Sequence, residues 1–371
     1  MSRRFRQTMK GSFFGDFVYN QVIPARHFLM QLDKTIDWEP FTATIVESYK
    51  GKAERGEVPY DPAMILKMLL LAYLYGISER QTEEFCTYYI PAKAFLGLGV
   101  TEPAPDHTTL CLFKRRLLKH GGAAAYENLF DMIIRQAQEK GVVFGKIQLV
   151  DATHTVADVN VEKDRKRFEQ GKPLADPDAS VVDKGERQVT KADLTTEKEK
   201  VTHRGYKTHV SMDAKTGIVT SIKPTMGNVA DNTQMPWLVQ KDAKMGIPAE
   251  TYAADRGYDD GELHEMLKNL EKHSALKLHD YRTNKKDPNK EPWIKLLADP
   301  FYQGGLFLRY QIERKFGEAK AWHRFARCRY RGLDRFKIQS YLTFMVLNLK
   351  RIVLLLTNTR LRPLAKHLKT A

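Results

Sequence analysis

The chain has 371 residues, of which 42% are hydrophobic and 28% are charged, so it is long enough for two domains and too apolar for wholesale disorder. Its 60 lysines and arginines outnumber 45 aspartates and glutamates, and the net charge of +15 makes a polyanion, above all nucleic acid, the expected partner. The basic start lacks an apolar stretch, and Lys67 interrupts the most apolar window, residues 64–77, so we expect neither a signal peptide nor a membrane span.

The first 135 residues are predicted to be helical. Asp61 followed by Pro62 is typical of a helix N-cap and first turn, and an apolar run follows them. Ser78, with Gln81 three residues later, predicts the start of a second helix. Two helices joined by a short turn resemble a helix-turn-helix, although any helical hairpin has the same pattern.

Two basic clusters are candidate DNA contacts. The first lies on a third predicted helix, from residue 106 to about residue 120, and consists of Lys114, Arg115 and Arg116. The second lies beyond residue 300, where 16 lysines and arginines outnumber three acidic residues, a net of +13 that leaves +2 for the rest of the chain. We therefore expect the main polyanion site in the C-terminal segment.

The C-terminal cations are interleaved with aromatic residues. Between residues 323 and 337 the sequence holds Arg324, Arg327, Arg329 and Arg331, together with Phe325, Tyr330 and Phe336. We expect the arginines to hold backbone phosphates and the aromatic rings to stack an unpaired base. The alternative is a basic loop that packs its aromatic rings inward.

From residue 146 onward the sequence predicts strands and helices in the order βββαβα, followed by a last strand and helix. The strands include a β-branched run at residues 146–159, a hairpin at residues 206–228 and a short strand at residues 251–254. This order implies a mixed sheet flanked by helices. Residues 161–200 contain 20 charged residues among 40 and are predicted to form a mobile surface insertion.

Two aspartates stand where buried strands are predicted to end. Asp151 follows residues 147–150, and Asp255 follows residues 251–254. A carboxylate at such a place needs a partner or a metal ion. Because the ends of neighbouring core strands point toward one place, we expect the two carboxylates to lie together. The alternative is that each caps a turn or a helix.

A third carboxylate, Glu313, lies on a helix predicted to begin near Leu306. Arg309 lies about one turn before it and Lys320 about two turns after it, so the three side chains line one face. This arrangement suits a metal-bound phosphodiester, with Glu313 on the metal and the two cations on flanking phosphates. Arg314 is a further candidate DNA contact. A row of surface ion pairs is the alternative.

The two aspartates and Glu313 resemble the Asp-Asp-Glu triad of bacterial insertion-sequence DDE transposases. More specifically, the spacing Arg309-x3-Glu313-x6-Lys320 resembles the signature Tyr-x2-Arg-x3-Glu-x6-Lys of one group of these enzymes, with Leu306 at the tyrosine position. That substitution leaves the role of the signature hydroxyl open in this chain.

Further segments extend the resemblance to nearly the whole chain outside residues 161–200. The N-terminal half is similar to the helical domain that precedes the catalytic core in the IS-five-like branch of the group. The other similar segments are DPDA at 176–179, GYKTHVSMDAKTG at 205–217, MGNVADN at 226–232 and ADRGYDDGE at 254–262.

The resemblance implies an α/β fold: an RNase H-like mixed β-sheet flanked by helices, preceded by an all-helical N-terminal domain. It also implies hydrolysis at transposon ends, which frees a 3′-hydroxyl, and attack of that hydroxyl on target DNA. The expected domains are residues 1–135 for DNA-end binding, residues 140–357 for catalysis and residues 358–371 as a basic tail.

Divalent metal ions are the expected cofactors. Carboxylates are natural ligands of Mg²⁺ or Mn²⁺, and two ions per active site would serve both the attacking and the leaving oxygen of an in-line displacement. Asp151 is assigned to bridge both ions, while Asp255 and Glu313 each complete one.

The expected partners are double-stranded DNA, namely transposon inverted-repeat ends and target DNA, and further copies of the chain in a homodimer or higher oligomer; no membrane is expected. Because Cys86, Cys111 and Cys328 lie far apart, we expect neither a disulfide frame nor a zinc motif but a reducing, cytoplasmic, nucleoid-associated location. Two alternatives are a nuclease of the same fold without strand transfer and an inactive DNA-binding protein. The presence of all three carboxylates disfavours the second.

Overall fold

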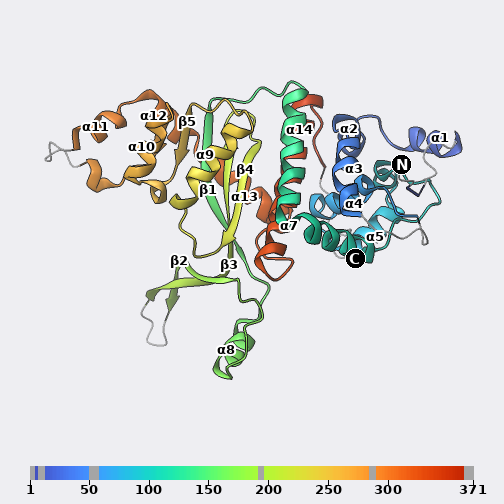
Figure 1. Cartoon of the computed structure of the whole chain (residues 1–371), viewed down its shortest axis with the longest axis horizontal. Helices are drawn as coiled ribbons and strands as arrows, with labels where there is room; N and C mark the ends of the chain where they lie inside the picture. Colours follow the sequence, from blue (N-terminus) through green and yellow to red (C-terminus); the bar gives the residue numbers. More distant parts are fainter. Residues whose placement is uncertain (1–4, 7–12, 50–57, 191–195, 284–289, 363–371) are drawn as a thin grey trace. The chain divides into compact units, whose positions relative to one another are not determined.

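The computed structural model describes residues 5–6, 13–49, 58–190, 196–283 and 290–362. The chain forms two compact units, whose elements are labelled in Figure 1. The helical unit consists of Met1–Val143, Trp322–Arg324 and Tyr341–Ala371, and the sheet unit consists of Phe144–Ala321 and Phe325–Ser340.

The last helix, α14 (Leu333–Thr357), contributes to both units, so the units differ from the predicted domains at this point. The prediction assigned the whole of this segment to the catalytic domain. The physical reason for the difference is visible at Tyr341, whose hydroxyl donates to Glu127 Oε2 at 3.1 Å inside the helical unit. Of the predicted basic tail, residues 363–371 lie outside the described residues.

The predicted helical N-terminal region is confirmed. Its elements are α1 (Phe13–Val22), α2 (Phe28–Thr35), α3 (Glu39–Ile45), the 3₁₀ turn η1 (Val46–Tyr49), α4 (Pro62–Leu74), α5 (Glu79–Tyr88), α6 (Ile90–Leu96) and α7 (His107–Glu139). Asp61 caps α4 by accepting the Ala63 N–H at 2.9 Å. Ser78 and Gln81 form a reciprocal capping box at the start of α5. Both predicted helix starts are therefore correct.

Two segments are apolar enough to compare with a membrane span. Among the described residues, α14 is the one single helix that is sufficiently long and apolar, and 67% of its apolar window is buried within the protein. α4 and α5 satisfy the same criterion only if they are taken together, and they meet at a bend of 108°. α4 is buried along its whole length, and its Lys67 pairs with Asp33 at 2.5 Å.

The sheet unit contains one mixed, six-stranded sheet. Its strands are β1 (Ile147–Val156), β2 (Ser180–Thr190), β3 (Thr196–Asp213), β4 (Val219–Met226), β5 (Thr251–Ala254) and β6 (His273–Leu276). β3 pairs antiparallel with β1, β2 and β4, whereas β5 pairs parallel with both β1 and β6. The core order β4-β3-β1-β5-β6, an antiparallel meander continued by two parallel strands, is that of the RNase H-like fold. The predicted fold class is confirmed.

Helices cover both faces of this sheet (Figure 1). The helices and 3₁₀ turns between β1 and α14 are α8 (Val161–Glu169), η2 (Asn232–Gln234), α9 (Met235–Lys244), η3 (Arg256–Tyr258), α10 (Gly261–Asn269), η4 (Asp280–Thr283), α11 (Glu291–Leu297), α12 (Pro300–Leu308) and α13 (Tyr310–Trp322). α12 approaches one face so closely that a Cβ at Gly305 would lie 2.6 Å from the Cβ of Ala275 and 3.1 Å from that of Ala253. Glycine is required there because helix and strands nearly touch.

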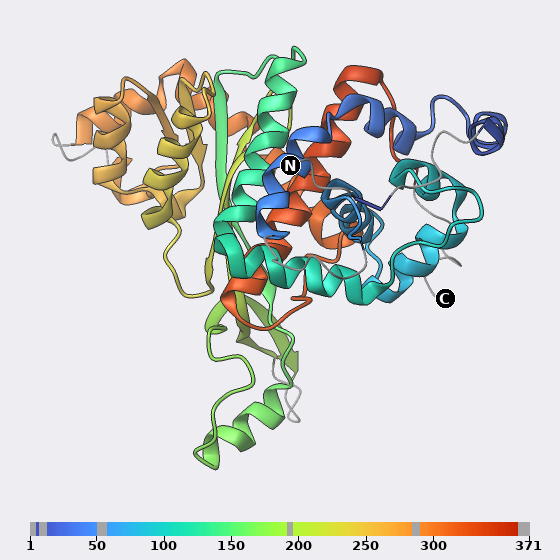
Figure 2. The same cartoon turned by 45° about the vertical axis from the view of Figure 1, so that its right-hand side comes forward.

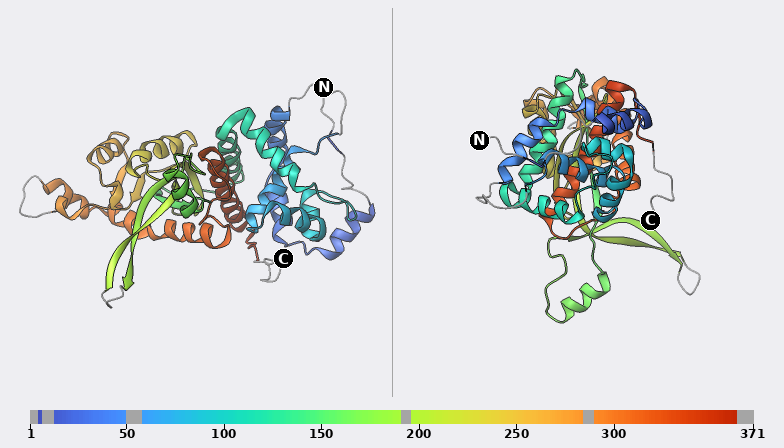
Figure 3. Two further views of the ribbon diagram at one scale, coloured as in Figure 1. Left: turned by 90° about the horizontal axis from the view of Figure 1, so that it is seen from below. Right: turned by 90° about the vertical axis from the view of Figure 1, so that its right-hand side faces the viewer.

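The segment 161–200, which the sequence predicts to be a mobile surface insertion, contains regular secondary structure. It contains α8 and a two-stranded ribbon, because β2 pairs with the first half of β3 beyond the edge of the main sheet. Figures 2 and 3 show the ribbon and α8 extending from one end of the sheet. Arg204 attaches the segment to β3 through Asp164 Oδ2 at 2.5 Å and the carbonyl of Asp176 at 2.6 Å.

α9 covers the face of the sheet opposite to α12 and carries a wholly buried carboxyl group, Asp242. Hydroxyl groups from β3 and β5 donate to its Oδ2, namely Ser211 at 2.6 Å and Tyr252 at 3.4 Å. Burial nevertheless raises the pKa of Asp242 from 3.8 to about 6, against the opposing effect of these hydrogen bonds. The folded protein therefore holds the Asp242 proton more tightly than the unfolded chain does.

We predict that Asp242→Asn stabilises the protein above pH 6. The protonated carboxyl contributes stability that is complete below pH 3.8 and is lost as the pH rises through about 6, a total of roughly 3 kcal/mol. Asparagine stays neutral, so the melting temperature of the variant should exceed that of the wild type by more at pH 8 than at pH 5. An equal difference at both pH values would show that Asp242 does not titrate in this range.

Candidate active site

Asp151 lies in the middle of β1 rather than at its end. β3 pairs with β1 as far as Val156, so the strand continues for five residues beyond the position where the sequence predicts its end. The carboxylate is partly exposed, and its Oδ1 accepts the N–H of Ala152 at 2.7 Å. The prediction that the strand ends before Asp151 is thus wrong. The prediction that the residues before Asp151 are buried is correct for Leu149 and Val150, which are fully buried.

Asp255 occupies the predicted position directly after β5. Its Oδ1 accepts the N–H of Gly257 at 3.0 Å and so caps the short turn η3, which is the structural role proposed as the alternative. The pairing of β1 with β5 brings it beside the other aspartate: Leu149 lies next to Ala253 in parallel register, and each carboxylate follows two residues later. Side chains two residues apart share a face, so both carboxylates belong to the face that α12 covers.

A third aspartate, Asp231, lies in the same neighbourhood and was not predicted. Asp231 lies near enough to Tyr258 to influence its phenol electrostatically. Burial raises the pKa of this phenol well above 10, and the carboxylates of Asp231, Asp151 and Asp255 raise it further. Asp231 Oδ1 pairs with Lys207 Nζ at 2.8 Å. Lys207 lies in the motif GYKTHVSMDAKTG and Asp231 in the motif MGNVADN. These two motifs were the sequence feature that could have indicated Asp231.

Glu313 lies in the first turn of α13 and is held by an ion pair. Arg309 forms the junction between α12 and α13, so the continuous helix predicted from Leu306 is two helices. The Arg309 guanidinium lies 2.9 Å from Glu313 Oε1, and 55% of the Glu313 side chain is exposed. An exposed pair at this spacing contributes only about 0.5 kcal/mol, so Glu313 can exchange partners at little cost. The alternative of surface ion pairs is therefore realised at this position.

The carboxylates fit a divalent cation in chemistry and partly in placement. Carboxylate oxygen is the ligand that Mg²⁺ and Mn²⁺ prefer, and the β1–β5 register places two such groups side by side. Within the described part of the chain, no three His, Cys, Asp or Glu side chains already converge on one metal position.

Comparison with known proteins identifies the family. Residues 149–349 match the Transposase DDE domain, which covers the sheet unit and more than half of the chain, and residues 17–116 match the Transposase domain (DUF772). The chain belongs to the DDE transposase family. The prediction of an insertion-sequence DDE transposase is confirmed, and with it an enzyme that cleaves DNA and transfers strands. DDE transposases use divalent metal ions and act on DNA.

The transposase is also similar to solved structures of low sequence identity. The piggyBac transposase synaptic complex with hairpin DNA is 10% identical, covers 99% of this chain and 82% of that chain, and gives a TM-score of 0.42. The Mos1 transposase paired-end complex with left transposon end is 11% identical, covers 74% of this chain and 81% of that chain, and gives a TM-score of 0.20.

The basic segment after α13 pairs with the end of β1. The N–H of Val156 donates to the carbonyl of Ala326 at 3.0 Å. The carbonyl of Val156 accepts the N–H of Cys328 at 2.7 Å. Two exposed arginines of the segment in the sheet unit contact one acidic residue. Arg327 Nε lies 3.2 Å from Asp158 Oδ1, and Arg331 Nε donates to the Asp158 carbonyl at 3.1 Å. Arg329 is half-buried in the sheet unit, and Arg324 is exposed in the helical unit.

The predicted base-stacking role of the interleaved aromatics is wrong for two of the three rings. Phe325 and Phe336 are fully buried, and Phe336 stacks on Tyr206 with ring centroids 4.7 Å apart. Their apolar rings fill the core of the sheet unit, which is the inward-packed alternative. Tyr330 is half-buried. On α13, the Arg314 guanidinium lies over the exposed ring of Tyr310 at 4.8 Å.

The cations of α7 differ in their surroundings. Lys114 is only 9% exposed and pairs with Glu79 of α5, so it is withdrawn from the predicted DNA surface. Arg115 is exposed, and the Arg116 guanidinium lies 5.3 Å from the centroid of the Tyr49 ring. The helix itself extends beyond the predicted residue 120, with a kink at Gly122.

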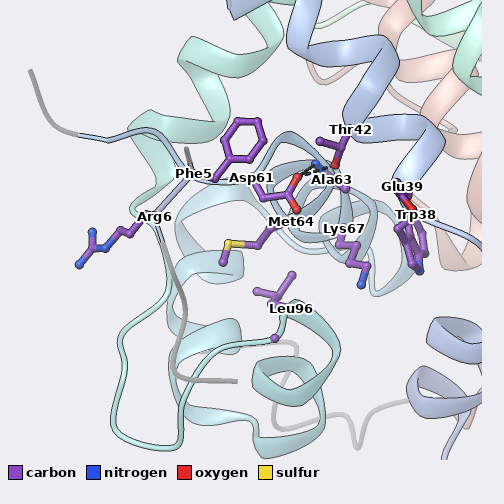
Figure 4. Close-up of a pocket in the computed structure, with 11 residues that line it drawn as sticks. Phe5, Arg6, Trp38, Glu39, Thr42, Asp61, Ala63, Met64, Lys67 and Leu96 are labelled. Atoms are coloured by element: carbon purple, nitrogen blue, oxygen red, sulfur yellow. Dashed lines mark hydrogen bonds between the residues drawn. The ribbon is translucent and has the colours of Figure 1, made fainter. Parts of the chain in front are cut away.

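The helical unit also contains a pocket of about 650 Å³ (Figure 4). Its polar lining is engaged in holding helices: Asp61 accepts from Thr42 Oγ1 at 2.5 Å as well as from the backbone of α4, and Lys67 also donates to the Phe95 carbonyl at 3.2 Å. Trp38 packs its ring over the same ammonium group at 5.0 Å. The pocket is thus explained by the packing of α4, and we assign it no ligand.

We predict that two neighbouring residues of α7 affect different properties, one the stability of the protein and the other its binding to DNA. Lys114→Ala leaves Glu79 buried without its cation and should cost roughly 3 kcal/mol of unfolding free energy. Arg115→Ala should leave stability unchanged and reduce the salt dependence of DNA binding by about one counterion. Urea unfolding and DNA affinity across a salt series measure the two effects. A stable Lys114→Ala protein that loses as much DNA affinity as Arg115→Ala would contradict the assignment.

Proposed function

We propose that Asp151, Asp255 and Glu313 form the catalytic site of the transposase and hold two Mg²⁺ or Mn²⁺ ions. The observation that carries this proposal is the parallel pairing of β1 with β5, which aligns the two aspartates on the face where α12 leads into α13. Asp151 is proposed to bridge both ions, while Asp255 and Glu313 each complete one. When bound, such ions activate a water molecule or hydroxyl and stabilise the leaving oxygen.

The residues of α13 are proposed to exchange partners on binding DNA. Arg309 holds Glu313 through a weak, half-exposed ion pair. A DNA phosphate can replace this carboxylate as the partner of the guanidinium, because it also accepts two hydrogen bonds and lies in a highly charged backbone. Binding of DNA to Arg309 and Lys320 would therefore free Glu313 to join the aspartates.

The remaining cations are proposed to contact DNA backbone phosphates. In the sheet unit they are Arg314, Arg327, Arg329 and Arg331, and in the helical unit they are Arg115, Arg116 and Arg324. This proposal is supported by the exposure of most of these arginine side chains and by the net charge of +13 beyond residue 300. The helical N-terminal region is proposed to bind the transposon ends.

The complete reaction is proposed to involve hydrolysis at inverted-repeat ends and transfer of the 3′-hydroxyl into target DNA. The working complex is proposed to be a homodimer or higher oligomer on DNA, in the cytoplasm at the nucleoid. Membership of the IS-five-like branch stays a prediction from the sequence motifs.

We predict that Asp151→Asn, Asp255→Asn and Glu313→Gln each reduce Mg²⁺-dependent cleavage by at least about 100-fold, because each removes ligand charge. DNA affinity should remain nearly intact. Cleavage of transposon-end DNA and strand transfer of pre-cut ends are measured separately, so that loss of either step is seen.

The control for these variants is Glu318→Gln. Glu318 lies on the same helix and pairs with Lys315 at 3.6 Å, so its neutral variant should remain active. Activity within about tenfold of the wild type in any of the three triad variants would remove that residue from the site.

A further inference from the structure

The helix α8 is exposed on nearly every side. Of its nine residues only Asp164 is buried, and its two large apolar side chains, Val161 and Phe168, are 70% and 72% exposed. A helix of this length is marginal by itself and is normally stabilised by packing an apolar face against the rest of its protein. The exposure of Val161 and Phe168 shows that other contacts hold α8 in place.

α8 is anchored through its one buried side chain. The carboxylate of Asp164 pairs with Arg204 of β3 at 2.5 Å, and its Oδ1 accepts the N–H of Ala175 at 3.0 Å. Arg204 is fixed in turn, because its Nε donates to the Ala179 carbonyl at 3.0 Å. A buried ion pair repays its desolvation only when its geometry is good, so this pair fixes the orientation of α8.

Three cations share one face of α8. Lys163 is followed three residues later by Lys166 and four residues later by Arg167, a spacing that places them side by side. Lys166 lies two residues after Asp164, about 200° round the helix, and so points away from the anchor. All three side chains are exposed, and within the described ranges the ammonium groups of Lys163 and Lys166 have no acceptor. Arg167 Nε donates to the Pro173 carbonyl at 2.8 Å.

The acidic residues of α8 do not neutralise this face. Glu169 pairs with Arg165 at 3.7 Å, and Asp164 is buried against Arg204. Glu162 is the one further acidic residue of the helix. Three cations thus face solvent beside a single carboxylate, which favours a polyanionic partner. Because DDE transposases act on DNA, that polyanion is the DNA backbone.

The strand β1 connects α8 to the proposed catalytic site. β1 runs five residues from Asp151 to Val156, about 17 Å, and α8 begins five residues later at Val161. Figures 2 and 3 show α8 beyond that end of the sheet. A DNA duplex rises about 3.4 Å per base pair, so about five base pairs separate the level of Asp151 from the end of β1. A duplex held at Asp151 reaches α8 only if it extends further than that.

We propose that the face of α8 formed by Lys163, Lys166 and Arg167 binds backbone phosphates of the substrate duplex, more than about five base pairs from the scissile phosphate. The placement rests on the proposed function of the triad, which puts the scissile phosphate beside Asp151. Phosphate contacts position a duplex without reading its sequence. α8 therefore holds the DNA in line with the active site, whatever the base sequence at that point.

The test is the double variant Lys163→Gln/Lys166→Gln of the full chain, because glutamine keeps the helix propensity of lysine. Affinity for a transposon-end duplex is measured across a salt series in EDTA, so that no strand is cut. The slope of log affinity against log salt should fall by about 1.8, and the affinity at about 0.15 M salt should fall about tenfold. Lys163→Arg/Lys166→Arg keeps both charges and should bind as the wild type does.

The matched control removes the same charge elsewhere. Arg165→Gln/Lys295→Gln replaces two exposed cations that are engaged in ion pairs, Arg165 with Glu169 and Lys295 with Glu291 of α11 at 2.8 Å. Its salt slope should change by less than about 0.5. Equal effects of the two double variants, or unchanged DNA binding by Lys163→Gln/Lys166→Gln, would overturn the proposal.

Shortening the duplex separates the role of α8 from the proposed catalytic site. The effect of the lysine variant should disappear when the DNA on one side of the cleavage site is shorter than about five base pairs. If the effect persists at every length, α8 binds DNA but the scissile phosphate does not lie beside Asp151, and the proposed catalytic site fails. If Asp151→Asn abolishes cleavage and the lysine variant binds every duplex normally, only the role of α8 fails.

A second copy of the chain is the alternative partner of α8, through Val161 and Phe168. In that case Phe168→Ser should lower the molecular mass in sedimentation equilibrium, and the lysine variant should bind DNA normally. That pair of results would contradict the proposal. An unchanged mass of Phe168→Ser together with weakened DNA binding of the lysine variant supports it.

Discussion

The proposed catalytic arrangement depends above all on the parallel pairing of β1 with β5. This pairing involves only three residue pairs, Ile147 to Leu149 beside Thr251 to Ala253. This register nevertheless places Asp151 and Asp255 side by side on one face of the sheet, each two residues after the last pair. A shift of register by one residue would send Asp255 and Asp151 to opposite faces. The close approach of Gly305 to Ala253 and Ala275 fixes α12 against the same strands, and α13 follows it with Glu313.

The same strand also organises the cations of the sheet unit. Beyond Asp151, β1 continues to Val156, where it pairs with the arginine-rich segment through Ala326 and Cys328. β1 thus carries Asp151 in its middle and pairs at its end with the segment that carries Arg327, Arg329 and Arg331. The weak ion pair between Arg309 and Glu313 can link phosphate binding to metal binding. One guanidinium cannot bind a DNA phosphate and the Glu313 carboxylate equally well, so in the proposed function a phosphate on Arg309 frees Glu313 for the metal.

Local chemistry was readable from the sequence, whereas long-range pairing was not. The caps at Asp61 and Ser78 and the position of Asp255 after β5 depend on a few neighbouring residues, and these predictions are correct. Lys114 was misjudged because its partner stands 35 residues away on another helix. The helix α8 and the strand β2 were not predicted, because the 20 charged residues among residues 161–200 leave no apolar periodicity in the sequence.

The central claim, that residues from β1, the end of β5 and α13 converge on one metal site, is tested most directly by iron-directed cleavage of the polypeptide. Fe²⁺ replaces Mg²⁺ at oxygen-ligand sites, and with ascorbate and peroxide it generates radicals that cut the backbone near the metal. In the transposase bound to end DNA, mass spectrometry should locate cuts in three segments, close to Asp151, Asp255 and Glu313, and excess Mg²⁺ should suppress all three together. Cuts confined to other segments, or cuts near the aspartates without any near Glu313, would contradict the account.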